Sequence, residues 1–265
     1  MIGAGDTHRD TRLAQAINAI GNNGFAGNLA GYIRACINYD NLIVIAYQGE
    51  ATPEILFREF VDPVVYQHID DVYVTANYVL DPFYKAHLQG VHAGLHRLFD
   101  LAPDRFKQTS YFKTYYEQTT LVDEVAVFAR TRTGITITVC IGTDQSSGRT
   151  FKKNELFSLE NTAATIAALV ESHWQKFQMK QSQPKGPVVD RLRQILADLH
   201  NVQLSPRQAE VAMLVLQGHS STSISLNLGV SMHTVKVFRR QLYAKCAISS
   251  QAQLFVMLLP LISDR

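Results

Sequence analysis

The chain has 265 residues, enough for two ordinary domains, and its 46% hydrophobic and 18% charged residues are typical of a globular protein. The formal net charge of +2 is too small to indicate a partner, but the charge is unevenly spread. Residues 191–265 carry eight Lys and Arg against three Asp and Glu, whereas the first 190 residues carry 17 against 20. This asymmetry indicates that only the C-terminal part contacts a polyanion.

No targeting or cofactor signal is evident. The first residues lack the apolar core of a signal peptide, and no apolar stretch is long enough to cross a bilayer. The three cysteines, Cys36, Cys140 and Cys246, have neither metal nor redox spacing. We therefore expect a cytoplasmic protein with no membrane partner, no cofactor and cysteines buried as small apolar residues.

Helix and strand patterns alternate over the first 177 residues. Helices are predicted at residues 13–20 and 25–37, and strands at residues 41–47 and 55–60. A helix at residues 72–84, ending near Asp81-Pro82, and an aromatic helix at residues 110–119 follow. Residues 122–130 and 135–141 predict a hairpin, and residues 151–177 a long amphipathic helix. This order predicts an α/β/α sandwich with an antiparallel sheet, an architecture suited to sensing a small ligand.

The C-terminal part is helical throughout. A polar segment from Gln178 to Pro187, with two prolines and a glycine, predicts a linker. A helix at residues 188–200 is followed by four more helices with caps at Ser205, Ser220, Ser231 and Ser250. We therefore divide this α+β chain into a ligand-sensing domain at residues 1–177, a linker at 178–189 and an all-α DNA-binding domain at 190–265.

The helix that follows Ser231 has two contrasting faces. At about 100° per residue, Val235, Phe238 and Leu242 share one face and are expected to pack inward. The opposite face combines long cations with a small apolar side chain, as a helix in the DNA major groove requires. The residues expected to contact double-stranded DNA are His233, Thr234, Lys236, Val237, Arg239, Arg240 and Lys245. A solvated basic face is the alternative interpretation of the same pattern.

Residues 204–254 resemble the LuxR-type helix-turn-helix. The matching positions are Leu204, Arg207, Glu210, Val211, Gly218, Ser220, Ile224, Leu228, Val230, Ser231, Thr234, Val235, Lys236, Lys245, Ser249, Ser250, Ala252 and Leu254. The resemblance implies that Lys236, Val237 and Arg240 face the groove and that the last helix pairs two subunits. The chain departs from the family pattern at Ser221-Thr222-Ser223, at Phe238 and at Cys246-Ala247.

The N-terminal part is similar in element order to the autoinducer domain of that family and to GAF/PAS-like sensors. No strand ends in the aspartate of a phosphoacceptor receiver, and the only tryptophan is Trp174. The autoinducer domain of that family binds its lactone with tryptophans, which this chain lacks at the corresponding place. The resemblance therefore implies that the chain binds another small molecule or is an orphan regulator. Aromatic walls with a few polar anchors suit a ligand pocket, for which we name Tyr78, Asp81, Phe83, Tyr84, Phe112 and Tyr116. Core packing is the alternative role of these aromatic residues.

Other chemistry is less well supported by the sequence. His87, His92 and His96 offer metal-like spacing if they are helical, but surface histidines are more common. The chain has no nucleophile elbow, phosphate loop or paired-cysteine zinc site, so we expect no enzyme. The predicted function is a homodimeric transcriptional regulator in which a small-molecule effector controls promoter binding through dimer geometry. The alternative is an orphan regulator controlled by protein–protein interaction, without a ligand.

Overall fold

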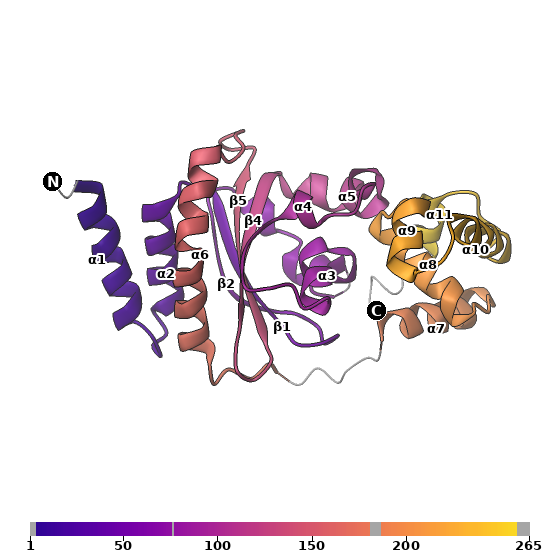
Figure 1. Cartoon of the computed structure of the whole chain (residues 1–265), viewed down its shortest axis with the longest axis horizontal. Helices are drawn as coiled ribbons and strands as arrows, with labels where there is room; N and C mark the ends of the chain where they lie inside the picture. The colour runs from indigo at the N-terminus through magenta and orange to yellow at the C-terminus, as the bar shows by residue number, and fades with distance from the viewer. Residues whose placement is uncertain (1–3, 76, 181–186, 259–265) are drawn as a thin grey trace.

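The computed structural model describes residues 4–75, 77–180 and 187–258. These residues form an elongated molecule with an α/β domain at one end and a helical domain at the other (Figure 1). The predicted fold class, an antiparallel sheet between helical layers followed by an all-α domain, is confirmed. Two predicted segments fall partly outside the described residues: the linker, at residues 181–186, and the end of the predicted DNA-binding domain, at residues 259–265.

Five strands form one antiparallel sheet in the order β2-β1-β5-β4-β3. Their bounds are β1 (Asn41–Tyr47), β2 (Glu54–Phe60), β3 (Gly94–Arg97), β4 (Leu121–Arg130) and β5 (Thr136–Asp144). Strands β1 and β5 are buried along their whole length, as their β-branched sequences predict. The short edge strand β3 has no clear apolar alternation, which is why the sequence pattern did not indicate it.

Alternate strand residues face two separate apolar cores. Val44, Val127 and Val139 face one helical layer, whereas Ile43 and Cys140 face the other. Helices α2 (Phe25–Cys36) and α6 (Lys153–Trp174) cover the first face, and α1 (Ala4–Asn18) packs outside α2 (Figure 1). The second face is covered by the short helices α3 (Pro82–Leu88), α4 (Leu98–Leu101) and α5 (Ser110–Thr114).

The second helical layer corrects two predictions. The helix predicted at residues 72–84 is a π-helical turn, Ile69–Tyr73, a 3-10 turn, Asn77–Leu80, and then α3. Asp81 has extended backbone angles, as a residue before proline favours, so no continuous helix can pass through it. The aromatic helix predicted at residues 110–119 ends at Thr114, and a 3-10 turn, Tyr116–Thr119, follows.

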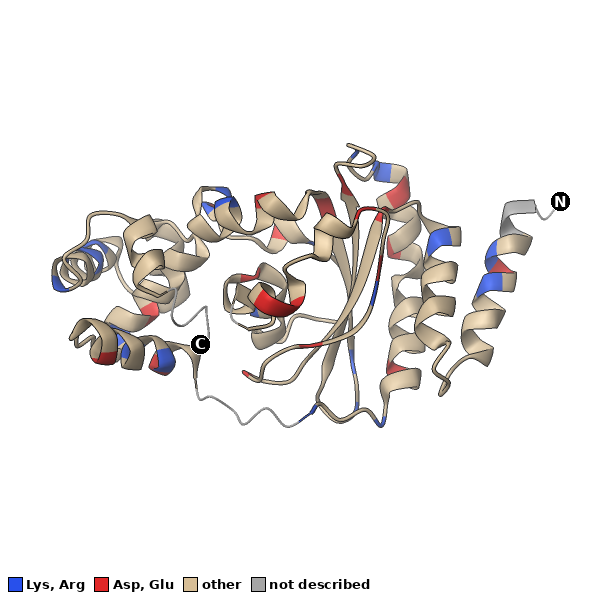
Figure 2. Ribbon diagram, turned by 180° about the vertical axis from the view of Figure 1, so that it is seen from behind, with Lys and Arg blue, Asp and Glu red and all other residues tan. Residues whose placement is uncertain are grey.

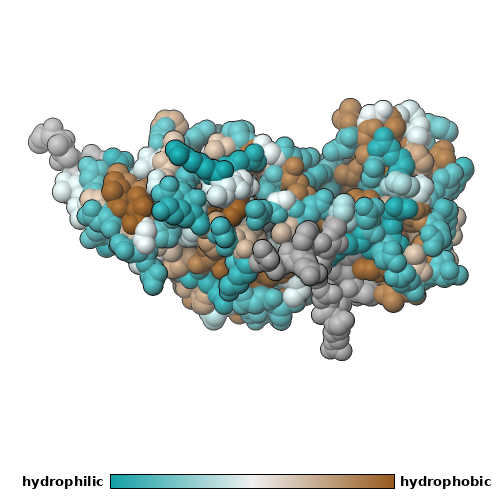
Figure 3. Space-filling model, turned by 90° about the horizontal axis from the view of Figure 1, so that it is seen from below, coloured by the Kyte–Doolittle hydropathy of each residue, from teal (hydrophilic) through white to brown (hydrophobic). Residues whose placement is uncertain are grey.

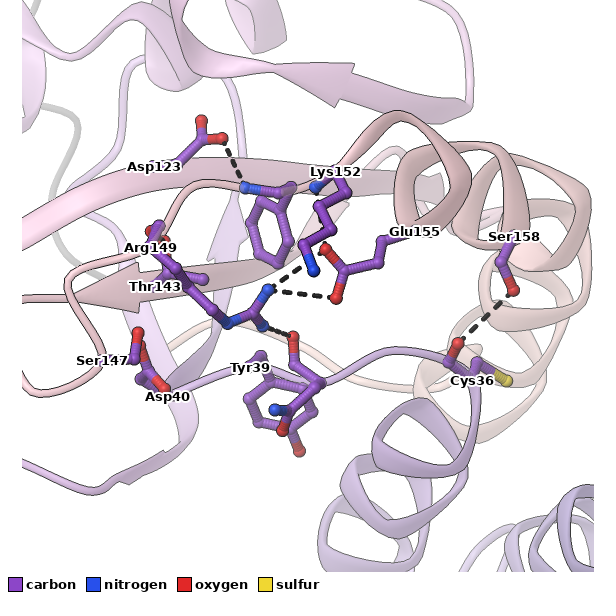
Figure 4. Close-up of polar contacts among 12 residues, drawn as sticks. Cys36, Tyr39, Asp40, Asp123, Thr143, Ser147, Arg149, Lys152, Glu155 and Ser158 are labelled. Carbon is purple, nitrogen blue, oxygen red and sulfur yellow. Dashed lines mark hydrogen bonds and ion pairs between the residues drawn. The ribbon is translucent and has the colours of Figure 1, made fainter. Parts of the chain in front are cut away.

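The loop between β5 and α6 is tied down by polar contacts (Figure 4). Arg149 donates from Nη1 to the two carboxyl oxygens of Glu155 at 3.0 and 3.1 Å. Glu155 also accepts from the backbone N–H of Lys152 at 2.8 Å, and the N–H of Phe151 donates to Asp123 Oδ2 at 3.1 Å. These bonds tie the start of α6 to strand β4.

The C-terminal domain consists of the five predicted helices. Their bounds are α7 (Val188–His200), α8 (Pro206–Gln217), α9 (Ser221–Leu228), α10 (Met232–Lys245) and α11 (Gln251–Met257). The predicted caps are confirmed: each of Ser205, Ser220, Ser231 and Ser250 accepts from a backbone N–H three residues ahead. Left-handed glycines end α8 and α9, where an L side chain would be strained.

The outer surface is mainly hydrophilic on the face in Figure 3, with apolar patches toward both ends of the molecule. Large apolar side chains that are exposed include Ile17 in α1, Phe157 in α6 and Leu226 in α9. Among the described helices, none combines the length and the apolar character that crossing a membrane requires.

Candidate DNA-binding surface and ligand cavity

Helix α10 carries the predicted DNA-binding residues on the side away from the core. Val235 and Leu242 are fully buried and Phe238 is partly buried, so the inward face predicted from the helical wheel is confirmed. His233, Lys236 and Arg240 are exposed, and Thr234 and Val237 are partly exposed. The helix lies at the outer end of the molecule, far from the N-terminal domain, where Lys and Arg residues gather (Figure 2). The outward face is therefore open to a large partner.

Two of the predicted DNA contacts also have partners within the domain. Arg239 donates from Nη1 to Ser221 Oγ at 3.2 Å and so links α10 to α9. Lys245 donates from Nζ to Gln203 O at 2.8 Å and to Gln208 Oε1 at 2.9 Å. Both side chains hold α10 in place, which is a role that the helical wheel alone does not indicate.

The N-terminal domain contains a cavity between the sheet and the second helical layer. Its volume is about 40 Å³. It is lined by Ile43, Ile45, Val65, Tyr66, Ile69, Tyr73, Asp81, Phe83, Tyr111, Tyr115, Tyr116, Thr119, Leu121, Glu124 and Cys140. These residues come from the sheet, from the turns before α3 and from the aromatic segment around α5. A second hollow of about 140 Å³ shares Tyr115 and Thr119 with the first.

Asp81 is held in the cavity wall by three elements. As the N-cap of α3, it accepts from the backbone N–H of Phe83 at 2.8 Å through Oδ1. Its Oδ2 accepts from Tyr73 Oη at 2.5 Å, and Tyr73 Oη lies 2.9 Å from Tyr47 Oη on β1. Burial raises the pKa of Asp81 to about 6, although the bond from Tyr73 acts in the opposite direction.

The structure brings together half of the residues predicted to bind a ligand. Asp81, Phe83 and Tyr116 line the cavity. Tyr78 and Tyr84 pack edge to face, with ring centroids 4.8 Å apart, and Phe112 stacks on Tyr116 at 5.1 Å. All three of these other aromatic residues are buried but do not line the cavity. They form the packing behind the wall.

Sequence reasoning missed the acid on the opposite wall. Glu124 lies in β4, is 8% exposed and lines the cavity. Its strand, LVDEVAVFAR, is apolar at residues 125–129, and Glu124 shares the cavity-facing side with Ala126 and Phe128. An acidic residue on the inward-facing side of a predicted strand could therefore have indicated this part of the site from the sequence. Burial raises the pKa of Glu124 well above its ordinary value, and the neighbouring Asp81 and Asp123 raise it further.

The histidines do not form the cluster that their spacing suggested. His87 lies in α3, with Nδ1 2.8 Å from Thr136 Oγ1 and Nε2 3.1 Å from Gly49 O. His92 and His96 are not helical, since His92 precedes strand β3 and His96 lies in it. Their rings pack edge to face, with centroids 4.6 Å apart. Within the described residues, no group of three potential metal ligands converges.

The two domains contact each other at the turn between α8 and α9. The carbonyl of Gly218 accepts from the backbone N–H of Arg105 at 2.9 Å, and the N–H of Ser220 donates to Asp104 Oδ1 at 2.9 Å. Gly218 has a φ of +97°, and a Cβ there would lie 2.7 Å from Thr109 Cγ2 and 2.9 Å from Phe106 Cα. Glycine is thus required both by the turn and by the close approach of the other domain.

A buried basic pair lies beside this turn. Lys85 in α3 donates from Nζ to Nε2 of His219, whose Nδ1 is 2.7 Å from Ser223 Oγ. Burial lowers the pKa of Lys85 to about 8. Burial, and then the charge of Lys85, lower the pKa of His219 to about 4. His219 is therefore neutral at neutral pH and accepts a proton poorly while the domains are in contact.

These features define a two-domain protein in which an α/β sandwich with a buried cavity is joined to a helix-turn-helix domain. Residues 202–258 match the family model described as bacterial regulatory proteins, luxR family. A protein of Aeromonas salmonicida, described as an HTH-type transcriptional regulator in the exeN 3' region, is 31% identical over 181 residues, which are 66% of this chain and 91% of that protein. The chain belongs to the LuxR family of transcriptional regulators.

Solved structures show similarity in the N-terminal domain. The VqsR LBD domain of Pseudomonas aeruginosa covers 64% of this chain and 98% of its own, with 22% identity and a TM-score of 0.53. The N-acylhomoserine lactone-dependent factor CepR2 of Burkholderia cenocepacia covers 64% and 97%, with 14% identity and a TM-score of 0.45. The first of these similarities establishes a shared fold for the N-terminal domain.

Proposed function

We propose that the N-terminal domain binds a small molecule in the cavity between Asp81 and Glu124, and that occupancy changes DNA binding by α10. The observation that carries this proposal is the position of helix α5. Its residue Tyr111 lines the cavity, while the helix packs against α8 and α11 of the C-terminal domain. A ligand that moves α5 would therefore also move the surface that packs against α8 and α11.

The coupling needs a differential free energy, because a ligand shifts an equilibrium only if it binds one arrangement better than the other. Thr109, the N-cap of α5, lies directly against Gly218 of the α8–α9 turn. The docked arrangement leaves the outward face of α10 open, so docking does not act by covering it (Figure 2). We infer that the domain contact instead sets the orientation of α10 relative to a second subunit.

The DNA-binding step would use the outward face of α10. Lys236, Val237 and Arg240 would lie in the major groove, with His233 and Thr234 at the start of the helix and Arg239 and Lys245 toward the phosphates. One such helix covers one half-site, so the active species would be a homodimer spanning half-sites about 34–36 Å apart. The protein would act in the cytoplasm, where it meets the chromosome.

The test has two parts and uses the full chain purified natively from its own host. Mass spectrometry of the denatured protein identifies any molecule that co-purifies, with the variant Phe83→Trp, which narrows the cavity, as the matched control. Mobility shift on DNA selected by the protein itself is then compared with and without that molecule. A co-purifying molecule that is reduced in the control and changes DNA affinity supports the proposal.

A second candidate function is control by a protein partner without any ligand. The small cavity favours it, since drug-sized ligands occupy pockets of about 300–1,000 Å³, whereas this cavity is about 40 Å³. In that case no small molecule co-purifies, DNA affinity does not respond to added compounds, and a protein captured by the N-terminal domain alters the mobility shift.

A further inference from the structure

The lining of the cavity is acidic. It consists of fifteen residues, all of them described, and includes two carboxyl groups, Asp81 and Glu124, but no Lys, Arg or His. Both acids are at least nine-tenths buried, at 9% and 8% exposure. Buried charges in proteins are ordinarily paired, because removing an ion from water is costly. None of the fifteen lining residues supplies a positive charge to the two acids.

The two acids differ in how they are satisfied. Asp81 accepts from Tyr73 Oη and from the N–H of Phe83. Glu124 has no such support, since within residues 4–75, 77–180 and 187–258 no group hydrogen-bonds to its carboxyl oxygens. The buried Oη of Tyr116, another lining residue, also has no partner among the described residues. The carboxyl oxygens of Glu124 are not among the fully buried unpaired atoms of the described residues, so they are open to the cavity and can accept from a bound group.

We propose that the cavity takes a small organic cation, a protonated amine whose ammonium group pairs with Glu124 and Asp81 and whose hydrocarbon part contacts Ile43, Ile45 and Val65. This inference rests on the proposed function, because it names the ligand class of the same cavity. An ammonium group has three donors and no acceptor, which matches two carboxyl groups that line the same cavity. An anion would meet only like charge here, and a neutral alcohol would leave Glu124 without a counter-charge.

The raised pKa of Glu124 agrees with this assignment. Burial and the neighbouring acids disfavour its charged form, whereas an opposite charge within a few ångströms favours it. The cation would therefore stabilise the ionised carboxylate that the empty cavity disfavours. The cavity of about 40 Å³ limits the ligand to a short hydrocarbon part.

Thermal unfolding of the full chain tests the class of ligand. The probes are 3-methylbutylamine, 3-methylbutanol and 3-methylbutanoate, which share one hydrocarbon part and differ in charge, at equal concentration and ionic strength. We expect the amine alone to raise the Tm, by about 2 °C or more. Glu124→Gln should abolish that rise, and Glu160→Gln, at an exposed position of α6, should retain it.

A second measurement needs no ligand. At about pH 8, Glu124→Gln should raise the Tm of the free protein, because it removes a buried acid that has no partner. If Glu124→Gln does not fold, Asp81→Asn replaces it in the probe series, because asparagine preserves the N-cap of α3. Loss of the amine response in either variant supports cation binding.

The contrary outcomes separate the two proposals. A Tm rise with the alcohol equal to that with the amine overturns cation binding and leaves small-molecule sensing in place. An amine response that survives in Glu124→Gln also overturns it. If none of the three probes shifts the Tm, cation binding is overturned, and the co-purification experiment then decides whether the domain senses a small molecule at all.

Discussion

Arg240 is the residue whose role in DNA binding is most directly testable. It is exposed in the middle of α10, on the side opposite the buried Val235 and Leu242. If its guanidinium group contacts a guanine edge through two hydrogen bonds, Arg240→Ala should weaken binding to selected DNA by about 1–3 kcal/mol. Mobility shift at several salt concentrations measures this loss. Arg132→Ala, at an exposed position in the β4–β5 turn, is the control and should bind normally.

The outcome that would contradict this assignment is equal affinity of Arg240→Ala and the unmodified chain at every salt concentration. The basic face of α10 would then be a solvated surface, as the alternative interpretation of the sequence holds. A loss that appears only at low salt would instead indicate a phosphate contact, because such contacts weaken as counterions accumulate.

At the scale of elements, the turn between α8 and α9 connects the domains. Gly218→Ala should strain the left-handed backbone by about 1–2 kcal/mol and push the new Cβ against Thr109 and Phe106. We therefore expect the backbone N–H of Arg105, which donates to Gly218 O, to exchange faster with solvent hydrogen. Hydrogen exchange followed by mass spectrometry measures this change.

Gly229→Ala is the matched control for that experiment. Gly229 ends α9 with a φ of +63°, but a Cβ there would meet nothing within 4 Å. It should therefore show the backbone strain without faster exchange at Arg105. If Gly218→Ala and Gly229→Ala leave the exchange of Arg105 equally slow, the turn does not hold the domains together.

At the scale of the whole molecule, we expect the domain contact to weaken in acid. His219 has a pKa of about 4 in the docked state against an ordinary value of 6.5. Between these values the docked state binds fewer protons than the separated state, so the contribution of His219 is complete above about pH 6.5 and falls as the pH drops toward 4. Lys85, whose pKa is lowered to about 8, loses its contribution at higher pH, between about 10.5 and 8. The nearby Asp104 acts against this loss, because its charge raises the pKa of His219.

Small-angle scattering at about pH 7.5 and about pH 5 measures this separation as an increase in the radius of gyration. His219→Gln removes the titrating group and should flatten the response, whereas His92→Gln, at an exposed position near the edge of the sheet, should leave it unchanged. An equal radius at both pH values for the unmodified chain would show that protonation of His219 does not open the contact.

Dimer formation is also a property of the whole molecule. We expect helix α6 to offer an association surface, because its Phe157 is 67% exposed. Burying such a side chain at an interface contributes about 1.5–3 kcal/mol, so Phe157→Ser should shift the sedimentation pattern toward the monomer. Leu226→Ser removes an apolar side chain of α9 that is 79% exposed, and it should sediment like the unmodified chain. A tightly DNA-binding monomer would rule out the dimer as the active species.

The helices of the C-terminal domain could be predicted almost completely from the sequence. Their caps, such as Ser205 with Gln208, and their left-handed terminator Gly218 act within a few residues of the helix end. The buried face of α10 follows from the spacing of Val235 and Leu242, because helical periodicity is local. The strands β1 and β5 were equally evident from their β-branched runs.

The cavity and the domain contact were decided only by the tertiary structure. Glu124 in β4 and Asp81 before α3 line the same cavity, although 42 residues separate the two acids in the sequence. Tyr84, Phe112 and Tyr116 all belong to the aromatic clusters of the sequence. Only Tyr116 lines the cavity, whereas Tyr84 and Phe112 are buried elsewhere in the core. Caps and periodicity follow from interactions between near neighbours, which any short segment expresses by itself. A cavity wall or a contact between domains depends on which segments, distant in the sequence, pack against each other. That packing is selected by the burial of side chains over the whole chain.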